Sequence, residues 1–174
     1  MIRHVALMGF MASGKSTIGQ KLARRLGVAF YDLDDLIAAE HGAIAEIFYG
    51  QGEDRFRAYE LQTLERVLAD GAPGIIALGG GATTHEPTDK LLKKRTYRVF
   101  VKVTPEQAAA RLRRSQRVRP LLGLSPSLHR IKELYAHRLP YYAHADLVVE
   151  AETLTPAQVV DRITQWMHRK KLNL

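Results

Sequence analysis

Cysteine is absent from this chain of 174 residues, so it has neither a disulfide nor a catalytic thiolate. Aromatic residues make up only 7% of it, and no apolar run approaches the ~18 residues that a membrane helix needs. We therefore expect no membrane partner. The first residues, 1–4, lead at once into an apolar run and lack the layout of a signal peptide. With the missing cysteine, this favours a cytoplasmic protein.

The overall composition is ordinary for a folded protein, with 46% hydrophobic and 25% charged residues. At this length we expect a single domain spanning 1–174, and a monomer. The net charge of +8 leaves three alternatives open. The basic surface could have no specific partner. It could instead draw polyanionic small molecules into a positive cleft, or it could bind nucleic acid.

The segment 9–16 reads Gly-Phe-Met-Ala-Ser-Gly-Lys-Ser and fits the phosphate-binding pattern G-x-x-x-x-G-K-[ST]. It follows the apolar run 5–8 and precedes a helical pattern, so loop amides and a helix N-terminus converge on one phosphate. Lys15 should bridge the β- and γ-phosphates, and Ser16 should bind Mg²⁺. We expect nucleotide contacts from Ala12, Ser13, Gly14, Lys15, Ser16 and Thr17.

Short apolar runs alternate with longer amphipathic ones along the chain. We expect strands at 5–8, 28–31, 74–78, 97–101 and 147–149. Helices are expected at 15–26, 34–40, around 44–48, 56–68, 89–94 and 104–114, at the start of 128–142, and at 156–169. This order predicts an α/β fold of three layers, α/β/α, with a five-stranded parallel sheet. Ligands of such sheets bind at the carboxyl ends of the strands.

An acidic cluster follows the second expected strand, where Asp32, Asp34 and Asp35 stand close together. The third strand, where many phosphate-loop proteins carry their metal-binding acid, ends in three glycines. We therefore expect Asp32 to serve Mg²⁺ with Ser16, while Asp34 meets the acceptor. An extended segment would point Asp32 and Asp34 the same way. The alternative is a solvated turn in which Asp34 caps the next helix.

The three glycines Gly79, Gly80 and Gly81 would let a ligand press against bare backbone amides, although a flexible turn would look the same. Further along, five arginines fall between Arg111 and Arg119. A solvated face is the simple interpretation of most of them, but Arg119 lies in an expected mobile lid, 112–126, and would neutralise γ-phosphate charge on closure. Nucleic-acid binding is disfavoured because no aromatic residue lies between Phe100 and Tyr135.

Taken together, these motifs resemble the shikimate kinase family, small members of the nucleoside monophosphate kinase-like P-loop fold. The resemblance spans nearly the whole chain. It rests on the phosphate loop, Asp32-x-Asp34, Phe56-Arg57 followed by Glu60, the triple glycine, Arg119-Pro-Leu-Leu, and Arg138-x-Pro-x-Tyr. It implies Mg²⁺- and ATP-dependent phosphorylation of the 3-hydroxyl of shikimate, on the way to chorismate and the aromatic amino acids, with the acceptor region at about 32–60.

The resemblance also implies roles for single residues. Asp34, Lys15 and Arg119 would be catalytic. The shikimate carboxylate would be clamped by Arg57 and Arg138. The acceptor pocket would be completed by Phe48, Phe56, Gly79, Gly80 and Gly81. The adenine would be flanked by Arg114 and Pro156.

Simpler interpretations of these side chains stay open. Arg57 could simply form an ion pair with Glu60 on its own helix, and Arg138 could face solvent. Phe48 and Phe56 could be ordinary core residues. The stretch from Arg114 to Arg119 is shorter than the family pattern suggests. Two rival functions remain as well: a gluconate-type kinase on the same fold, and a nucleotide-binding protein without catalysis.

Overall fold

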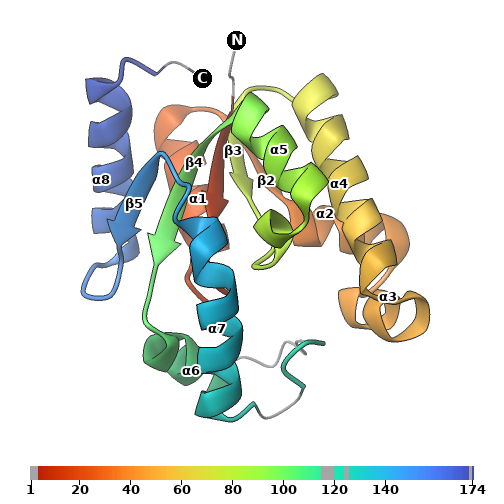
Figure 1. Ribbon diagram of the computed structural model, residues 1–174. Coiled ribbons are helices and arrows are strands. Elements are labelled where there is room, and N and C mark those ends of the chain that lie inside the picture. Colours follow the sequence, from red (N-terminus) through yellow and green to blue (C-terminus); the bar gives the residue numbers. More distant parts are fainter. Residues whose placement is uncertain (1–3, 115–119, 124–125, 173) are drawn as a thin grey trace.

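The computed structural model describes residues 4–114, 120–123, 126–172 and 174 (Figure 1). Its centre is a sheet of five parallel strands in the order β2-β3-β1-β4-β5. This confirms the expected α/β fold with a five-stranded parallel sheet. The strands are β1 (His4–Met8), β2 (Ala29–Asp32), β3 (Gly74–Ala77), β4 (Thr96–Lys102) and β5 (Leu147–Glu150).

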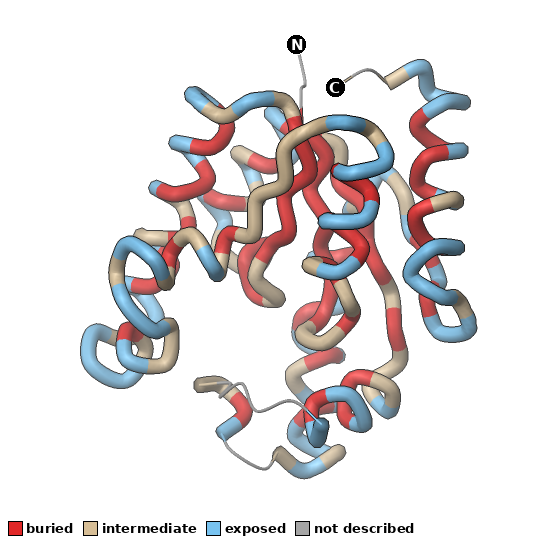
Figure 2. Tube along the Cα trace, turned by 180° about the vertical axis from the view of Figure 1, so that it is seen from behind, coloured by how far each residue is buried: buried red, intermediate tan, exposed pale blue. Residues whose placement is uncertain are grey.

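The burial of each strand follows its place in the sheet. Every residue of β1 and β3 is buried, which is why these strands read as unbroken apolar runs rather than alternating ones. The edge strands β2 and β5 are only partly covered. In Figure 2 the buried part of the trace runs through the middle of the molecule, along the strands and the inner sides of the helices.

Helices cover both faces of the sheet. On one face α1 packs against α8, and on the other α5 packs against β4 and α4 (Figure 1). The described helices are α1 (Lys15–Leu26), α2 (Leu33–His41), α3 (Ile44–Gln51), α4 (Glu53–Asp70), α5 (Glu86–Arg95), α6 (Pro105–Arg113), α7 (Leu128–Tyr142) and α8 (Pro156–Arg169), with a short 3₁₀ turn at Ala82–Thr84. None of the helices in the described part of the chain combines the length and the apolar character that crossing a bilayer requires.

Two local expectations were wrong. Asp34 does not cap the second helix, because α2 already begins at Leu33 and Asp32 caps it by accepting a hydrogen bond from the backbone N–H of Asp35 at 3.4 Å. Asp34 therefore stands in the first helical turn and not in an extended segment beside Asp32. In addition, α7 stays helical to Tyr142 and carries Pro140 within it.

Helices α2, α3 and α4 form a subsidiary unit beside the sheet. A small apolar cluster of Ile37, Ile47 and Phe56 joins them, with Phe48 and Tyr59 packed against it. This cluster is separate from the main core. It places the acceptor region predicted at 32–60 next to the carboxyl ends of the strands. The lid predicted at 112–126 lies partly outside the described residues, and both subregions stay predictions.

Candidate active site

A cavity of about 610 Å³ lies where the strands end. Its walls come from the phosphate loop, the start of α2, helices α3, α4 and α7, and the segment after β3. Residues far apart in sequence thus meet at the carboxyl edge of a parallel sheet, where such folds bind ligands. Pro120 and Leu121, from the region expected to form a lid, also line it.

The phosphate loop turns sharply between β1 and α1. Gly9 has a φ of 149°, and a Cβ there would lie 2.5 Å from the carbonyl oxygen of Val101, so the backbone passes too close for any side chain. Gly14, at φ 95°, precedes the first turn of α1. The Lys15 ammonium is buried and donates hydrogen bonds to the carbonyls of Gly9 at 2.9 Å and Phe10 at 3.0 Å. A fixed cation and a helix N-terminus therefore face the same anion site.

Two oxygen ligands stand beside this loop. The hydroxyl of Ser16 donates to Oδ2 of Asp32 at 2.5 Å, joining the first turn of α1 to the end of β2. Within the described residues, no group of three or more histidine, aspartate or glutamate side chains could hold a metal. Ser16 and Asp32 fit Mg²⁺, which binds through one or two protein oxygens plus water and substrate phosphates.

Two buried arginines converge on the far part of the cavity. Arg57 of α4 is 6% exposed and Arg138 of α7 is 3% exposed. A Cβ on Gly81 would overlap Nη2 of Arg57 and lie 3.0 Å from Nη2 of Arg138, so both guanidinium groups meet at this glycine. Arg138 does not face solvent. Two forked cations at one point form a site for a small anion such as a carboxylate.

Arg57 is held by two carboxylates on its own helix. Its Nη1 donates to Oε2 of Glu60 at 2.7 Å, and its Nη2 donates to Oε1 of Glu53 at 3.0 Å. The intrahelical pairing considered from the sequence is therefore present, and it does not remove Arg57 from the cavity. Glu60 is fully buried, and this burial raises its pKa to about 7 against the opposing charge of Arg57. The sequence pattern identified the pairing but not the burial.

Asp34 lies on the cavity wall next to the glycine segment. A Cβ on Gly79 would stand 3.0 Å from Oδ1 of Asp34, and one on Gly80 would stand 3.2 Å from the backbone nitrogen of Met11 in the phosphate loop. The glycine segment thus passes an acid, the phosphate loop and the arginine pair in turn. Bare glycine backbone is what allows these groups to come so close together.

An aromatic wall closes another side of the cavity. The rings of Phe48 and Phe56 have centroids 4.7 Å apart, and both residues line the cavity. Phe56 also belongs to the small apolar cluster, so the core and pocket interpretations both hold for it. The guanidinium of Arg57 lies 5.3 Å from the Phe56 ring centroid, which is within reach of a cation–π contact.

A second hollow of about 320 Å³ lies on the other side of the phosphate loop. It is lined by Ser13, Gly14 and Thr17 of the loop region, by Pro156 and by Arg111. Nη1 of Arg111 donates to the carbonyl of Ala12 at 3.1 Å. The sequence predicts Arg114 at the adenine, whereas the structure places Arg111 in this hollow.

Arg114 is exposed and is not among the residues that line the second hollow. Arg119, the expected lid cation, lies outside the described residues. The roles assigned to both arginines from the sequence stay predictions.

The strand order, the phosphate loop and the acceptor-sized cavity define a P-loop kinase that acts on a small molecule. The profile of the family described as "Shikimate kinase" matches residues 11–168. The chain belongs to the shikimate kinase family.

Two similar proteins illustrate the sequence match. A shikimate kinase from Nitrobacter winogradskyi is 38% identical over 97% of this chain and 78% of its own length. One from Thermodesulfovibrio yellowstonii is 34% identical over 97% of this chain and 96% of its own length. The match therefore covers the loop, the cavity and the sheet together.

Solved structures agree. Shikimate kinase from Acinetobacter baumannii in complex with shikimate superposes with a TM-score of 0.91 at 31% identity, covering 99% of this chain and 97% of that one. Shikimate kinase from Aquifex aeolicus gives 0.81 at 34% identity, covering 97% and 98%. Deoxyadenosine kinase from M. mycoides with bound dCTP, at 16% identity and a TM-score of 0.66 over 95% of this chain and 99% of that one, shares the fold.

Proposed function

We propose that this protein transfers the γ-phosphoryl group of ATP to the 3-hydroxyl of shikimate, a step in aromatic amino acid biosynthesis. One observation carries the proposal. Arg57 and Arg138 converge at Gly81 in the same cavity that reaches the phosphate loop. A ring alcohol with a carboxylate matches this arrangement, because the anion and the reacting hydroxyl need different parts of one cavity. The family match supports the same substrate.

The arginine pair would bind the carboxylate. Both guanidinium groups are buried, and the protein interior screens charge less than water does. A carboxylate placed between them is therefore attracted more strongly than it would be in water. Gly79, Gly80 and Gly81 would line the ring, and Phe48 and Phe56 would cover its apolar side. Rigid anchoring at the carboxylate would hold the 3-hydroxyl at a fixed distance from the nucleotide, which is a large part of what catalysis of phosphoryl transfer requires.

Asp34 would accept the proton of the attacking hydroxyl. As the new bond from the hydroxyl oxygen to the γ-phosphorus forms, the proton passes to a carboxylate oxygen of Asp34. The bond from the γ-phosphorus to the β,γ-bridging oxygen breaks, and that electron pair leaves with ADP. Lys15 would neutralise charge that gathers on the phosphate oxygens in the transition state.

Mg²⁺ would be held by Ser16 and, through water, by Asp32. When bound it supplies charge neutralisation and orientation of the phosphates. The hydrogen bond between these side chains keeps two hard oxygen ligands together at the start of α1.

The nucleotide base would occupy the second hollow. Arg111 and Pro156 line it from different elements, with the phosphate loop between them and the acceptor cavity. A planar guanidinium stacks well on an aromatic base, so Arg111 is our choice for the adenine contact. The sequence-based roles of Arg114 at the base and Arg119 on the γ-phosphate are kept as alternatives for the lid region.

We also infer that the protein works as a monomer in the cytoplasm. All the side chains assigned above belong to one chain, and the reaction needs ATP. Arg57 and Arg138, two of the arginines that contribute to the positive net charge, are buried in the acceptor cavity. Their burial supports a small anion rather than nucleic acid as the ligand.

The test is ADP release in a coupled assay with Mg²⁺ and ATP, with shikimate added or withheld. We expect a large stimulation by shikimate and none by gluconate at equal concentration. Chelation of Mg²⁺ by EDTA should abolish turnover. Stimulation by gluconate alone would favour the rival sugar-acid kinase, and ATP binding without turnover on either acceptor would favour a non-catalytic nucleotide-binding protein.

A further inference from the structure

Tyr142 joins two parts of the acceptor cavity that are distant in sequence. It is 1% exposed at the end of α7, and its ring lies 4.9 Å from that of Phe100 in β4. Its hydroxyl donates a hydrogen bond to the carbonyl oxygen of Gly80, and its interaction with Arg138 opposes the rise in its pKa that burial causes. One phenol therefore binds the glycine at which Arg138 also lies, since a Cβ on Gly80 would stand 3.1 Å from Nη1 of Arg138.

Arg138 has fewer partners than Arg57 among the residues that the structure describes. Arg57 has ion pairs with Glu53 and Glu60. Arg138 forms no ion pair within 4 Å with any residue that the structure describes, and its Nη1 is buried without a hydrogen-bond partner there. Its guanidinium lies 5.7 Å from the Phe10 ring centroid, a contact that does not fix the direction of its N–H groups.

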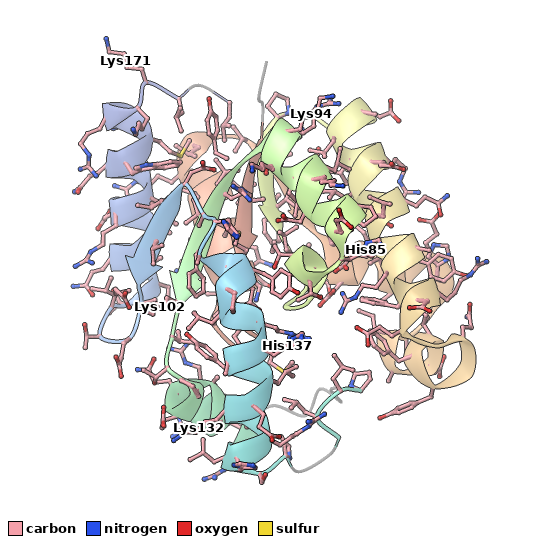
Figure 3. All side chains as sticks on the ribbon, in the orientation of Figure 1. His85, Lys94, Lys102, Lys132, His137 and Lys171 are labelled. Atoms are coloured by element: carbon pink, nitrogen blue, oxygen red, sulfur yellow. The ribbon has the colours of Figure 1, made fainter. Side chains whose placement is uncertain are left out.

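The local backbone explains why an anchor is needed at this point. Arg138 and Tyr142 are four residues apart on α7 and so lie on one face of the helix. Figure 3 shows α7 with its side chains and marks His137, which precedes Arg138. Pro140 stands between them and cannot donate a backbone hydrogen bond to the preceding turn. The last turn of α7 is thus tied less firmly by its own backbone, and the bond from Tyr142 to Gly80 ties it to the sheet side of the cavity.

We propose that Tyr142 is a positioning residue, which accepts an N–H of Arg138, donates its own proton to Gly80, and so aims the Arg138 guanidinium at the substrate carboxylate. The inference rests on the proposed function, since it concerns the carboxylate clamp. Burial raises the pKa of Tyr142 well above its ordinary value, so the hydroxyl keeps its proton and remains a donor at neutral pH.

The first test is Tyr142→Phe, which removes the hydroxyl and keeps the ring against Phe100. The hydroxyl acts on the carboxylate only through Arg138, so its loss should raise KM and Kd for shikimate about 3- to 10-fold, the effect of losing one typical hydrogen bond. The kcat and the KM for ATP should stay within about twofold. Tyr135→Phe is the matched control, because Tyr135 is a buried tyrosine two turns earlier on α7, and the hydrogen bond to Gly80 comes from Tyr142. It should leave all constants unchanged.

The second test separates positioning from general support of the fold. Arg138→Ala should weaken shikimate binding strongly, and adding Tyr142→Phe to it should weaken binding no further, because the hydroxyl acts through Arg138. The methyl ester of shikimate, which lacks the carboxylate charge, should bind the Tyr142→Phe variant and the unchanged protein alike.

Additive effects in the double variant, or an equal loss with the ester, would overturn the positioning role while leaving the clamp intact. So would a Tyr142→Phe variant that binds shikimate normally. Normal shikimate binding by Arg138→Ala would overturn the clamp itself, and with it the role of Tyr142.

Discussion

Glu60 and Asp34 point at the same glycine. A Cβ on Gly79 would lie 2.7 Å from Oε1 of Glu60 and 3.0 Å from Oδ1 of Asp34. Two carboxyl groups thus approach one small space at the edge of the cavity, and the nearby charge of Asp34 adds to the rise in the pKa of Glu60 that burial causes. A neighbouring negative charge disfavours the ionised form of Glu60.

The first prediction concerns stability and pH. The pKa of Glu60 rises from 4.5 to about 7 on folding, so the folded state binds more protons than the unfolded chain between these values. The contribution of Glu60 to stability is full below about pH 4.5 and is lost as the pH rises through 7, by roughly 3 kcal/mol. Urea unfolding of Glu60→Gln between pH 5 and 8 should show a flatter pH dependence than the unchanged protein.

Glu65→Gln is the control for this experiment, because Glu65 is an exposed glutamate on the same helix, α4. It should keep the original pH dependence. If Glu60→Gln kept it too, Glu60 would be ionised throughout the range and its partnership with Arg57 would dominate its burial.

The second prediction concerns the acceptor proton. Asp34→Asn keeps the shape of the side chain but removes its basicity, so kcat should fall on the order of 10²-fold or more. ATP binding, measured by calorimetry, should survive because the phosphate loop is unchanged. Asp54→Asn, an exposed change in the first turn of α4, should have no effect. Unchanged turnover in Asp34→Asn would remove Asp34 from the chemistry.

The third prediction concerns the space at Gly81. Its φ of −110° suits alanine, but the added Cβ would overlap Nη2 of Arg57 and crowd Arg138. Gly81→Ala should therefore push the two guanidinium groups apart and raise KM for shikimate about tenfold or more, with KM for ATP little changed. Gly50→Ala is the matched control, since nothing lies within 4 Å of a Cβ there. Equal KM values for shikimate in both variants would argue against a carboxylate site at Gly81.

Local sequence patterns were enough to predict the phosphate loop and the buried strands. The phosphate loop is a contiguous motif, and the buried strands β1 and β3 are short apolar runs between turn residues. The clamp arginines came from a family resemblance, because α4 and α7 are separated in sequence and nothing local indicates that Arg57 and Arg138 meet.

The misses arose where tertiary contacts decide the outcome. Asp32 and Asp34 are both good helix-capping residues, and only the point at which β2 leaves the sheet selects Asp32. The full burial of Glu60 follows from the packing of α4 against α2, α3 and α5. The bond from Tyr142 to Gly80 joins residues 62 positions apart. None of these carries a signal in its neighbouring residues.

The last prediction compares two arginines on the nucleotide side. Arg111 donates to the carbonyl of Ala12 and lines the same hollow as Pro156, whereas Arg114, the C-cap of α6, does not line it. Arg111→Ala should raise KM for ATP and Kd for ADP several-fold, because a stacking cation is worth about 1 kcal/mol or more. Arg114→Ala should change neither by more than about twofold, and KM for shikimate should stay constant in both. The reverse ranking would return the adenine contact to Arg114 and mean that the lid region folds over the base when nucleotide binds.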